Sequence, residues 1–274
     1  MTPVCEGIFD SHAHYFDARF EREYEGGADA ILHTVLSKTV QNILNVGTNP
    51  ATSRMAIGQA ARYGGMFAAV GIHPEDAHGL NERTALDDLE TLLGTAQTRR
   101  RDKIVAIGEI GLDYHAPSFG GVPLDRDLEK RVFEAQLDLA ERLDLPVVIH
   151  NREANGDLFE ILLRHPKARG VLHSFSGSPE LVREYTRRGW YLSFSGTVTF
   201  KNAPRVREAL LATPRDRLLI ETDCPYLAPH PFRGSLNHSG LLVYTVEAVA
   251  ALLGSEPQAV ADLTRKNAET LFFA

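Results

Sequence analysis

Six side chains of types that bind metals in proteins follow short apolar runs along this chain. They are His12, His14, Glu109, His150, His173 and Asp223. Imidazole nitrogens and carboxylate oxygens are ligands for divalent cations such as Zn²⁺, Mn²⁺ and Mg²⁺. Four imidazoles and two carboxylates are enough to hold two such cations side by side. A pair of cations can activate water, so these residues predict a metal-dependent hydrolase.

The apolar runs that precede these residues read as strands. They are short, rich in Val, Ile and Leu, and almost continuously apolar, which is typical of strands buried on both faces of a parallel sheet. Side chains two apart on a strand share a face, so His12 and His14 are expected to point the same way. The eight expected strands are residues 7–10, 42–47, 66–71, 104–109, 146–150, 170–173, 190–193 and 218–221.

Segments of helical length lie between most of these strands. The clearest is 125–143, where Phe133, Leu137 and Ala140 recur on one face and Pro146 follows the end. The other expected helices are residues 29–38, 51–63, 85–94, 154–164, 179–188, 204–211, 241–253 and 258–272.

The alternation of strand and helix predicts right-handed βαβ crossovers. Eight such units favour a closed (β/α)8 TIM barrel, with a doubly wound open sheet as the alternative. No linker or low-complexity stretch interrupts the pattern, so one domain is expected over residues 1–274. In such a barrel the loops after the strands form the active face, which is where the six side chains would lie.

The charge and the cysteines limit the class of protein. The formal net charge of −7 and the pI of about 5.9 argue against a protein that coats nucleic acid non-specifically, but a nuclease stays open because bound cations supply local positive charge. No signal peptide precedes Cys5, and no apolar run approaches the ~20 residues that span a bilayer. A cytoplasmic protein, with Cys5 and Cys224 reduced and no membrane association, is expected.

Six blocks of the chain resemble the TatD family of metal-dependent hydrolases, in the same order and over almost the whole length. The resemblance implies a TIM barrel of the amidohydrolase type and Mg²⁺-dependent deoxyribonuclease activity. The blocks are Phe9-Asp-Ser-His-Ala-His14, Val70-Gly-Ile-His-Pro74, Ile107-Gly-Glu-Ile-Gly-Leu-Asp-Tyr114, Val171-Leu-His-Ser-Phe-Ser-Gly177, Ser193-Phe-Ser-Gly-Thr-Val-Thr-Phe200 and Leu219-Ile-Glu-Thr-Asp-Cys-Pro-Tyr-Leu-Ala-Pro229.

The resemblance also implies a role for each of the six side chains. His12 and His14 match ligands of a first metal, and His150 and His173 match ligands of a second. The implied catalytic residues are Glu109, as the carboxylate that bridges both metals, and Asp223, as a ligand of the first metal that handles the proton of the attacking water. Two divalent ions per chain are thus expected, with Mg²⁺ in use and Zn²⁺ or Mn²⁺ as alternatives.

Four further residues are candidates for binding substrate: His73, Arg152, Tyr226 and Arg233. His73 follows the third expected strand, and the guanidinium of Arg152 suits a phosphate oxygen. Tyr226 and Arg233 follow the last expected strand and could line a nucleic-acid groove. The chain departs from the family in this region, because Arg233-Gly-Ser-Leu-Asn-His-Ser239 lacks the family's basic pair and Glu-Pro. The departure affects the expected substrate and leaves the metal ligands in place.

Three functions are consistent with these residues. The first is a deoxyribonuclease of the exonuclease type, with DNA as its partner, no membrane association and no evident obligate protein partner. The second is hydrolysis of another ester or amide on the same metals, as in a D-aminoacyl-tRNA deacylase, because metal pairs polarise carbonyl and phosphoryl oxygens alike. The third is a non-catalytic protein that binds metal or nucleic acid, which the complete ligand set argues against.

Overall fold

The computed structural model describes residues 4–274, which divide into two compact units. The terminal unit comprises residues 4–45, 63–66 and 173–274, and the middle unit comprises residues 46–62 and 67–172. A single domain over residues 1–274 stays a prediction, and residues 1–3 of that range lie outside the described part.

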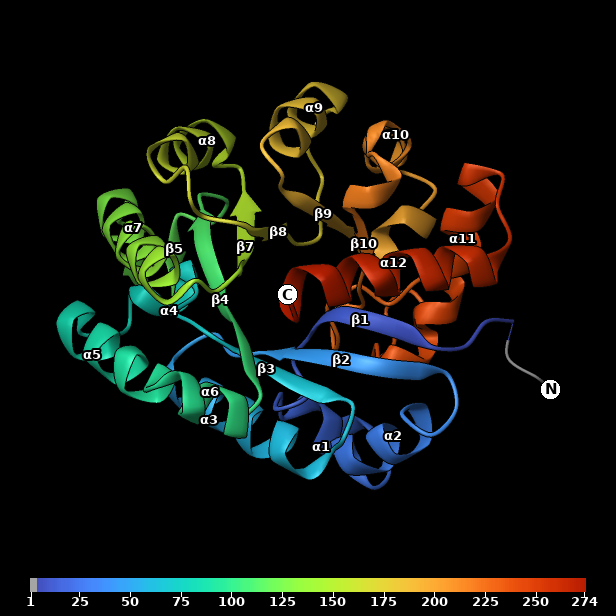
Figure 1. Cartoon of the computed structure of the whole chain (residues 1–274), viewed down its shortest axis with the longest axis horizontal. Helices are drawn as coiled ribbons and strands as arrows, with labels where there is room; N and C mark the ends of the chain where they lie inside the picture. Colours follow the sequence, from blue (N-terminus) through green and yellow to red (C-terminus); the bar gives the residue numbers. More distant parts are fainter. Residues whose placement is uncertain (1–3) are drawn as a thin grey trace. The chain divides into compact units, whose positions relative to one another are not determined.

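The middle unit is built on parallel strands that follow one another in the order β3, β4, β7, β8 (Figure 1). β4 (Ile104–Asp113) pairs with β3 (Met66–Val70) on one side and with β7 (Val147–Arg152) on the other, and β7 pairs with β8 (Gly170–Leu172). α7 (Arg126–Leu143) packs on β4, and α8 (Asn155–Arg164) packs on β7. The remaining helices of the unit are α3 (Pro50–Arg62), α4 (Pro74–Ala77), α5 (Glu82–Leu93) and α6 (Ala96–Arg101).

The helix α7 shows why the prediction from periodicity succeeds here. Asp125 precedes it, and the Asp125 carboxylate accepts hydrogen bonds of 3.0 Å from the backbone N–H groups of both Asp127 and Leu128. The predicted apolar face, with Phe133, Leu137 and Ala140, is buried. Burial of this stripe fixes α7 on β4, the strand that carries Glu109.

The terminal unit contains a second set of parallel strands. β1 (Ile8–Ala13) pairs with β2 (Val40–Val46), β9 (Tyr191–Phe194) pairs with β10 (Leu218–Ile220), and a bridge from Ala13 to Cys224 joins β1 to the segment after β10. α12 (Pro257–Phe272) packs on β1 and β10 (Figure 1). The other helices of the unit are α1 (Arg19–Glu23), α2 (Gly27–Val35), α9 (Pro179–Arg187), α10 (Pro204–Ala212), α11 (Leu242–Leu253) and the 3₁₀ turns η1 (Gly196–Thr199), η2 (Arg215–Arg217) and η3 (Ser239–Leu241).

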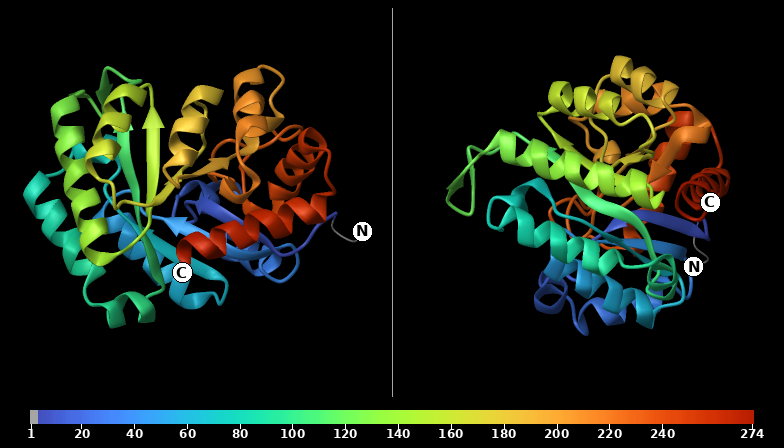
Figure 2. Two further views of the ribbon diagram at one scale, coloured as in Figure 1. Left: turned by 45° about the horizontal axis from the view of Figure 1, so that its top comes forward. Right: turned by 60° about the vertical axis from the view of Figure 1, so that its left-hand side comes forward.

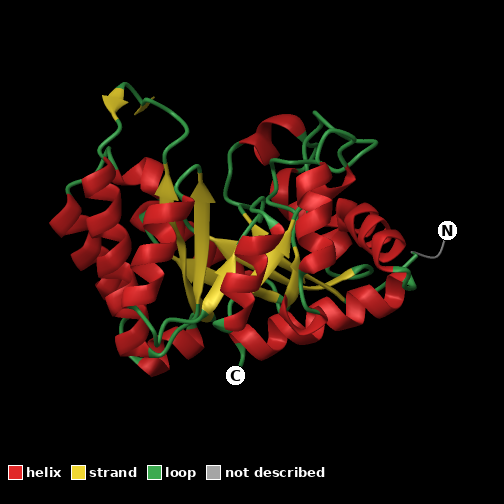
Figure 3. Cartoon of the chain, turned by 90° about the horizontal axis from the view of Figure 1, so that it is seen from above, coloured by secondary structure: helices red, strands yellow, loops and turns green. Residues whose placement is uncertain are grey.

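A short hairpin, which the sequence did not predict, lies between β4 and α7. Its strands are β5 (Ser118–Phe119) and β6 (Val122–Pro123), and the two glycines that join them both have positive φ, 56° and 84°. The hairpin extends away from α7 and lies beyond the arrowheads of the long strands (Figures 2 and 3). It therefore projects at the carboxyl end of the middle unit's sheet.

Every predicted strand is present in the structure, but β1, β4 and β7 continue past their predicted ends. Glu109 and His150, predicted as the last residues of their strands, therefore lie inside longer strands, and His12, predicted to follow its strand, lies within β1. The prediction stopped where the apolar run stopped. Their backbone groups nevertheless continue the sheet's hydrogen-bonding pattern, which polar side chains do not prevent.

Within residues 4–274, no single helix has both the length and the apolar character to cross a membrane. One bent pair of helices is long and apolar enough only when its two members are taken together, and on length and composition alone. The pair is Ser239–Leu253 with Pro257–Phe272.

Candidate metal centre

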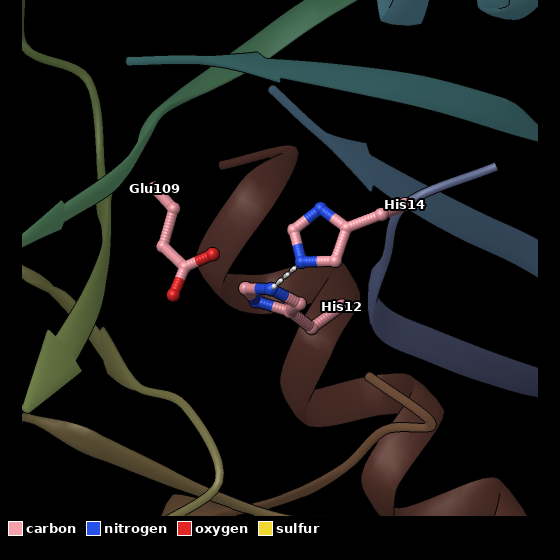
Figure 4. Close-up of side chains that lie close together, drawn as sticks. All are labelled: His12, His14 and Glu109. Atoms are coloured by element: carbon pink, nitrogen blue, oxygen red, sulfur yellow. Dashed lines mark hydrogen bonds between the residues drawn. The ribbon is translucent and has the colours of Figure 1, made fainter. Parts of the chain in front are cut away.

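Three predicted ligands meet in the terminal unit. Nε2 of His12 lies 3.0 Å from Nε2 of His14, as the dashed line in Figure 4 shows. Oδ1 of Asp223 lies 3.5 Å from Nε2 of His14 and 3.8 Å from Nε2 of His12. We call His12, His14 and Asp223 the terminal cluster. Two nitrogens and one carboxylate oxygen this close together can bind a single divalent cation.

Backbone pairing explains how residues so far apart in the sequence reach one another. The N–H of Asp223 donates to the carbonyl of His12 at 2.9 Å, and the N–H of His14 donates to the carbonyl of Cys224 at 2.8 Å. Asp223 has a φ of 58°, in the left-handed region that few residues other than glycine adopt. This turn after β10 directs the carboxylate toward the two histidines.

A buried network behind the terminal cluster supports this turn. The carboxylate of Asp10, which is fully buried, accepts hydrogen bonds from Thr222 N at 2.9 Å, Thr222 Oγ1 at 2.7 Å and Ser239 Oγ at 2.7 Å. Burial raises the pKa of Asp10 to about 6, although these hydrogen bonds oppose the rise. Asp10 thus anchors the segment that leads into Asp223.

His173 belongs to the same unit and lies against His12. The two rings stack with centroids 4.0 Å apart and an interplanar angle of 16°. Nδ1 of His173 lies 3.3 Å from Oε1 of Glu221, an oxygen that also accepts from the N–H of Ser174 at 2.7 Å. Glu221 was not among the predicted site residues. The sequence could have indicated Glu221, because it lies two residues before Asp223 in the block that resembles the TatD family.

The histidines control the charge of Asp223. Burial alone would raise its pKa, but the hydrogen bond with His14 and the charges of His173, His12 and His14 together hold the pKa below its ordinary value. The carboxylate of Asp223 is therefore ionised at neutral pH and suited to bind a cation.

A second group of ligands forms in the middle unit. Oε1 of Glu109 lies 2.9 Å from Nδ1 of His150 and 3.4 Å from Nε2 of His73; Figure 4 labels the Glu109 side chain. The other ring nitrogen of His150, Nε2, lies 3.0 Å from Oδ2 of Asp113. We call Glu109, His150, His73 and Asp113 the middle cluster. His73, predicted only as a substrate-binding residue, thus lies among the candidate ligands.

The close pairing of β4 and β7 brings Glu109 and His150 together. Gly111 has a φ of 141°, and a Cβ atom there would overlap the backbone of His150. Only glycine permits this approach. The N–H of Glu109 also donates to the carbonyl of Gly47 at 2.7 Å, which fixes the backbone from the other side.

Asp113 is held in place by a residue that the sequence did not indicate. Glu129 on α7 accepts from the N–H of Asp113 through Oε2 at 2.9 Å, and its Oε1 lies 2.9 Å from Nε2 of His78. Burial would raise the pKa of Asp113, but the hydrogen bonds with His150 and His115 and the charges of His150 and Arg152 hold it below its ordinary value. An ionised Asp113 can fix the ring of His150, as carboxylates do for metal-binding histidines.

The other three residues that were predicted to bind substrate differ in their contacts. Arg152 is half exposed, with NH1 3.9 Å from Oδ2 of Asp113. Tyr226 is exposed, and its ring centroid lies 6.5 Å from that of His14. The guanidinium of Arg233 lies over the ring of Phe200, 4.6 Å from its centroid. Arg152 and Tyr226 therefore adjoin their clusters, whereas the contact of Arg233 is with Phe200.

The clusters fit divalent cations. Their donors are imidazole nitrogens and carboxylate oxygens, which suit Mg²⁺, Mn²⁺ and Zn²⁺. Oε2 of Glu221 is buried without a hydrogen-bond partner among the described residues, a costly arrangement that a cation bound nearby would offset. Cys5 and Cys224 are buried free thiols.

Comparison with known proteins shows the family to which the chain belongs. Residues 9–273 match the family model described as TatD related DNase. The metal-dependent hydrolase YabD of Bacillus subtilis (strain 168) is 38% identical over 267 residues, covering 97% of this chain and 98% of that protein. The metal-dependent hydrolase TatD of Mycobacterium tuberculosis (strain ATCC 25618 / H37Rv) is 33% identical, with 97% of each chain covered.

Solved structures show the same fold. YJJV, a TatD homologue from Escherichia coli K12, superposes with a TM-score of 0.86 at 28% identity, covering 99% of both chains. A TatD family hydrolase from Entamoeba histolytica gives a TM-score of 0.83 at 20% identity, covering 98% of this chain and 99% of that one. The predicted (β/α)8 barrel is confirmed. The chain belongs to the TatD family of metal-dependent hydrolases.

Proposed function

We propose that this metal-dependent hydrolase cleaves phosphodiester bonds of DNA and uses two divalent cations to do so. The observation that carries the proposal is the convergence of His12 Nε2, His14 Nε2 and Asp223 Oδ1 within 3.0 to 3.8 Å. The description of the matching family as a DNase supports the choice of substrate.

We assign the ligands as the family resemblance implies. His12, His14 and Asp223 would hold one cation, His150 and His173 the other, and Glu109 would contribute to both. When bound, a cation pair polarises a phosphoryl oxygen, lowers the pKa of water and stabilises the leaving alkoxide. Mg²⁺ is the proposed working ion, with Mn²⁺ or Zn²⁺ as substitutes.

The chain's own residues would orient the substrate and move the proton. Asp223 is ionised because its pKa is lowered, so its carboxylate can accept a proton from the attacking water. His73 and Arg152 would bind phosphate oxygens, since both lie at the middle cluster and Arg152 is half exposed. Asp113 would keep the His150 ring in the orientation that binds metal.

We also propose the setting in which the enzyme acts. Two buried free thiols suit a reducing compartment, so we place the protein in the cytoplasm. DNA would be its macromolecular partner, with no obligate protein partner and no membrane association.

The test is nuclease activity on DNA labelled at the 5′ or the 3′ end, both single-stranded and duplex. Metal is stripped from the protein, and Mg²⁺, Mn²⁺ or Zn²⁺ is then restored separately. Cleavage should return with metal and be lost in Asp223→Asn, and the label should reveal the polarity. Protein that holds metal but cleaves no DNA would contradict the proposal, and aminoacyl-tRNA and small esters would then be the substrates to test.

A further inference from the structure

Tyr226 is exposed although its position is fixed. Its side chain is 46% exposed, yet its hydroxyl donates to Oδ2 of Asp17 at 2.8 Å. Tyr15 offers a contrast, because its hydroxyl is also bonded, to Ser239 Oγ at 2.8 Å, while its ring is only 1% exposed. A tyrosine that serves packing buries its ring, as Tyr15 does. Tyr226 instead leaves an apolar ring in solvent and holds it still.

The backbone of Tyr226 is held as firmly as its hydroxyl. Its N–H donates to the carbonyl of Asp223 at 2.9 Å, and its carbonyl accepts from Nδ2 of the buried Asn237 at 2.6 Å. Asp17 is itself anchored, because its Oδ1 accepts from the N–H of Arg19 at 2.7 Å and its own N–H donates to the carbonyl of His14 at 3.0 Å. A ring with so little freedom loses little entropy when a flat ligand covers it.

The ring also lies beside a proposed metal ligand. Its centroid is 6.5 Å from that of His14, with an angle of 67° between the two planes. On one side the guanidinium of Arg19 lies over it, 5.7 Å from the centroid, and Arg19 NH1 donates to the carbonyl of Pro225 at 3.4 Å. Arg19, which is itself paired with Glu23 at 2.9 Å, places a guanidinium next to the ring, and the 46% exposure of Tyr226 leaves part of its surface open to a ligand.

We infer that Tyr226 is a stacking site for the nucleobase of the nucleotide next to the scissile phosphate. This inference rests on the proposed function. A nucleotide carries its base and its phosphate on one sugar, so a base on Tyr226 places its phosphate near His14. Aromatic stacking accepts any base, because every base has a π face. The site therefore predicts a need for a base at this position with little preference among the four.

The experiment compares two single-stranded oligonucleotides that differ at one nucleotide, which is either intact or abasic, next to the cleaved phosphate. For the wild-type protein, KM should be about tenfold or more higher for the abasic oligonucleotide. Tyr226→Ala should raise KM for the intact oligonucleotide to the abasic value and leave KM for the abasic one unchanged. Tyr226→Phe, which keeps the ring and loses the bond to Asp17, should give an intermediate KM.

Tyr24→Ala is the matched control, because Tyr24 is also exposed, at 41%, and lies at the end of α1. This variant should distinguish the two oligonucleotides as the wild type does. Equal KM values for both oligonucleotides in the wild type, or full discrimination in Tyr226→Ala, would overturn the inference while DNA cleavage stands.

If the wild type cleaves neither oligonucleotide, DNA cleavage fails, and fluorescence anisotropy of binding then decides the inference. Base-dependent binding that is lost in Tyr226→Ala would uphold the stacking site. Equal binding of the two oligonucleotides would refute it.

Discussion

The two clusters are held together in different ways. In the terminal cluster nitrogen faces nitrogen, with Nε2 of His12 and Nε2 of His14 3.0 Å apart. In the middle cluster both nitrogens of His150 face carboxylate oxygens, at 2.9 Å from Glu109 and 3.0 Å from Asp113. One hydrogen bond can join two neutral imidazoles, and it uses nitrogens that would otherwise bind a cation. A cation held by both nitrogens would therefore replace this hydrogen bond, whereas in the middle cluster hydrogen bonds with two carboxylates orient His150 in advance.

The largest effect should come from the terminal cluster. Asp223→Asn removes the charge that pairs with His12 and His14 and the acceptor for the proton of the attacking water. We expect kcat to fall by about 10³-fold or more, since several kcal/mol of transition-state stabilisation are involved. Asp216→Asn, at a carboxylate that is 74% exposed, is the matched control and should keep full activity. Turnover within tenfold of the wild type would contradict the role of Asp223.

Glu109→Ala tests the middle cluster in the same assay. Loss of this carboxylate should cost most of the activity, about 10²-fold or more, while the circular dichroism spectrum stays that of the wild type. Glu109 is a proposed ligand of both cations, so the amount of bound metal should fall in parallel with activity. Wild-type turnover in this variant would refute the proposed bridging role.

Asp113→Asn tests whether Asp113 contributes to metal binding by orienting His150, because Asp113 is not itself a proposed metal ligand. The amide keeps the shape of the side chain but weakens its hold on Nε2 of His150. We expect metal affinity, measured by calorimetry, to fall about 10- to 100-fold. Asp138→Asn, at a side chain that is 75% exposed, should bind metal as the wild type does. Unchanged affinity in Asp113→Asn would show that Glu109 alone orients His150.

Removal of the metal should affect the terminal unit more than the middle unit. Binding of a cation at about 100 times its Kd stabilises the folded state by about 2.7 kcal/mol, so chelation should lower Tm by about 5 to 10 °C. Hydrogen exchange should then rise more in β1 and around Asp223 than in β4 and β7. An equal rise of hydrogen exchange in both regions would contradict the proposed difference between the terminal and the middle cluster.

The smallest effect is expected at Arg233, which contacts Phe200 rather than either cluster. Arg233→Ala should raise KM about two- to fivefold, the size of an exposed cation–π contribution, with kcat unchanged. Arg54→Ala, at another exposed arginine, is the control. A collapse of kcat in Arg233→Ala would place this residue in the chemistry instead.

Much of the fold could be predicted because its signals are local. Apolar runs located the strands, and the 3.6-residue period together with Asp125 located α7 to within one residue. The spacing of His12 and His14 also indicated their shared direction. Glu221, Asp113 and Glu129 were missed for a physical reason. Each is a buried carboxylate whose partners come from other segments, and a local pattern cannot show which carboxylates face inward.

The terminal cluster joins residues that the ribosome makes far apart in time. His14 and Asp223 are separated by 223 − 14 = 209 positions, so at about 5 to 20 residues per second roughly 10 to 40 s pass between their syntheses. The middle cluster is complete earlier, once His150 has been made. A nascent chain arrested before Asp223 would therefore carry one set of metal ligands intact and the other lacking its carboxylate. Hydrolytic capacity should accordingly arise only after Asp223 has been made and has left the ribosome.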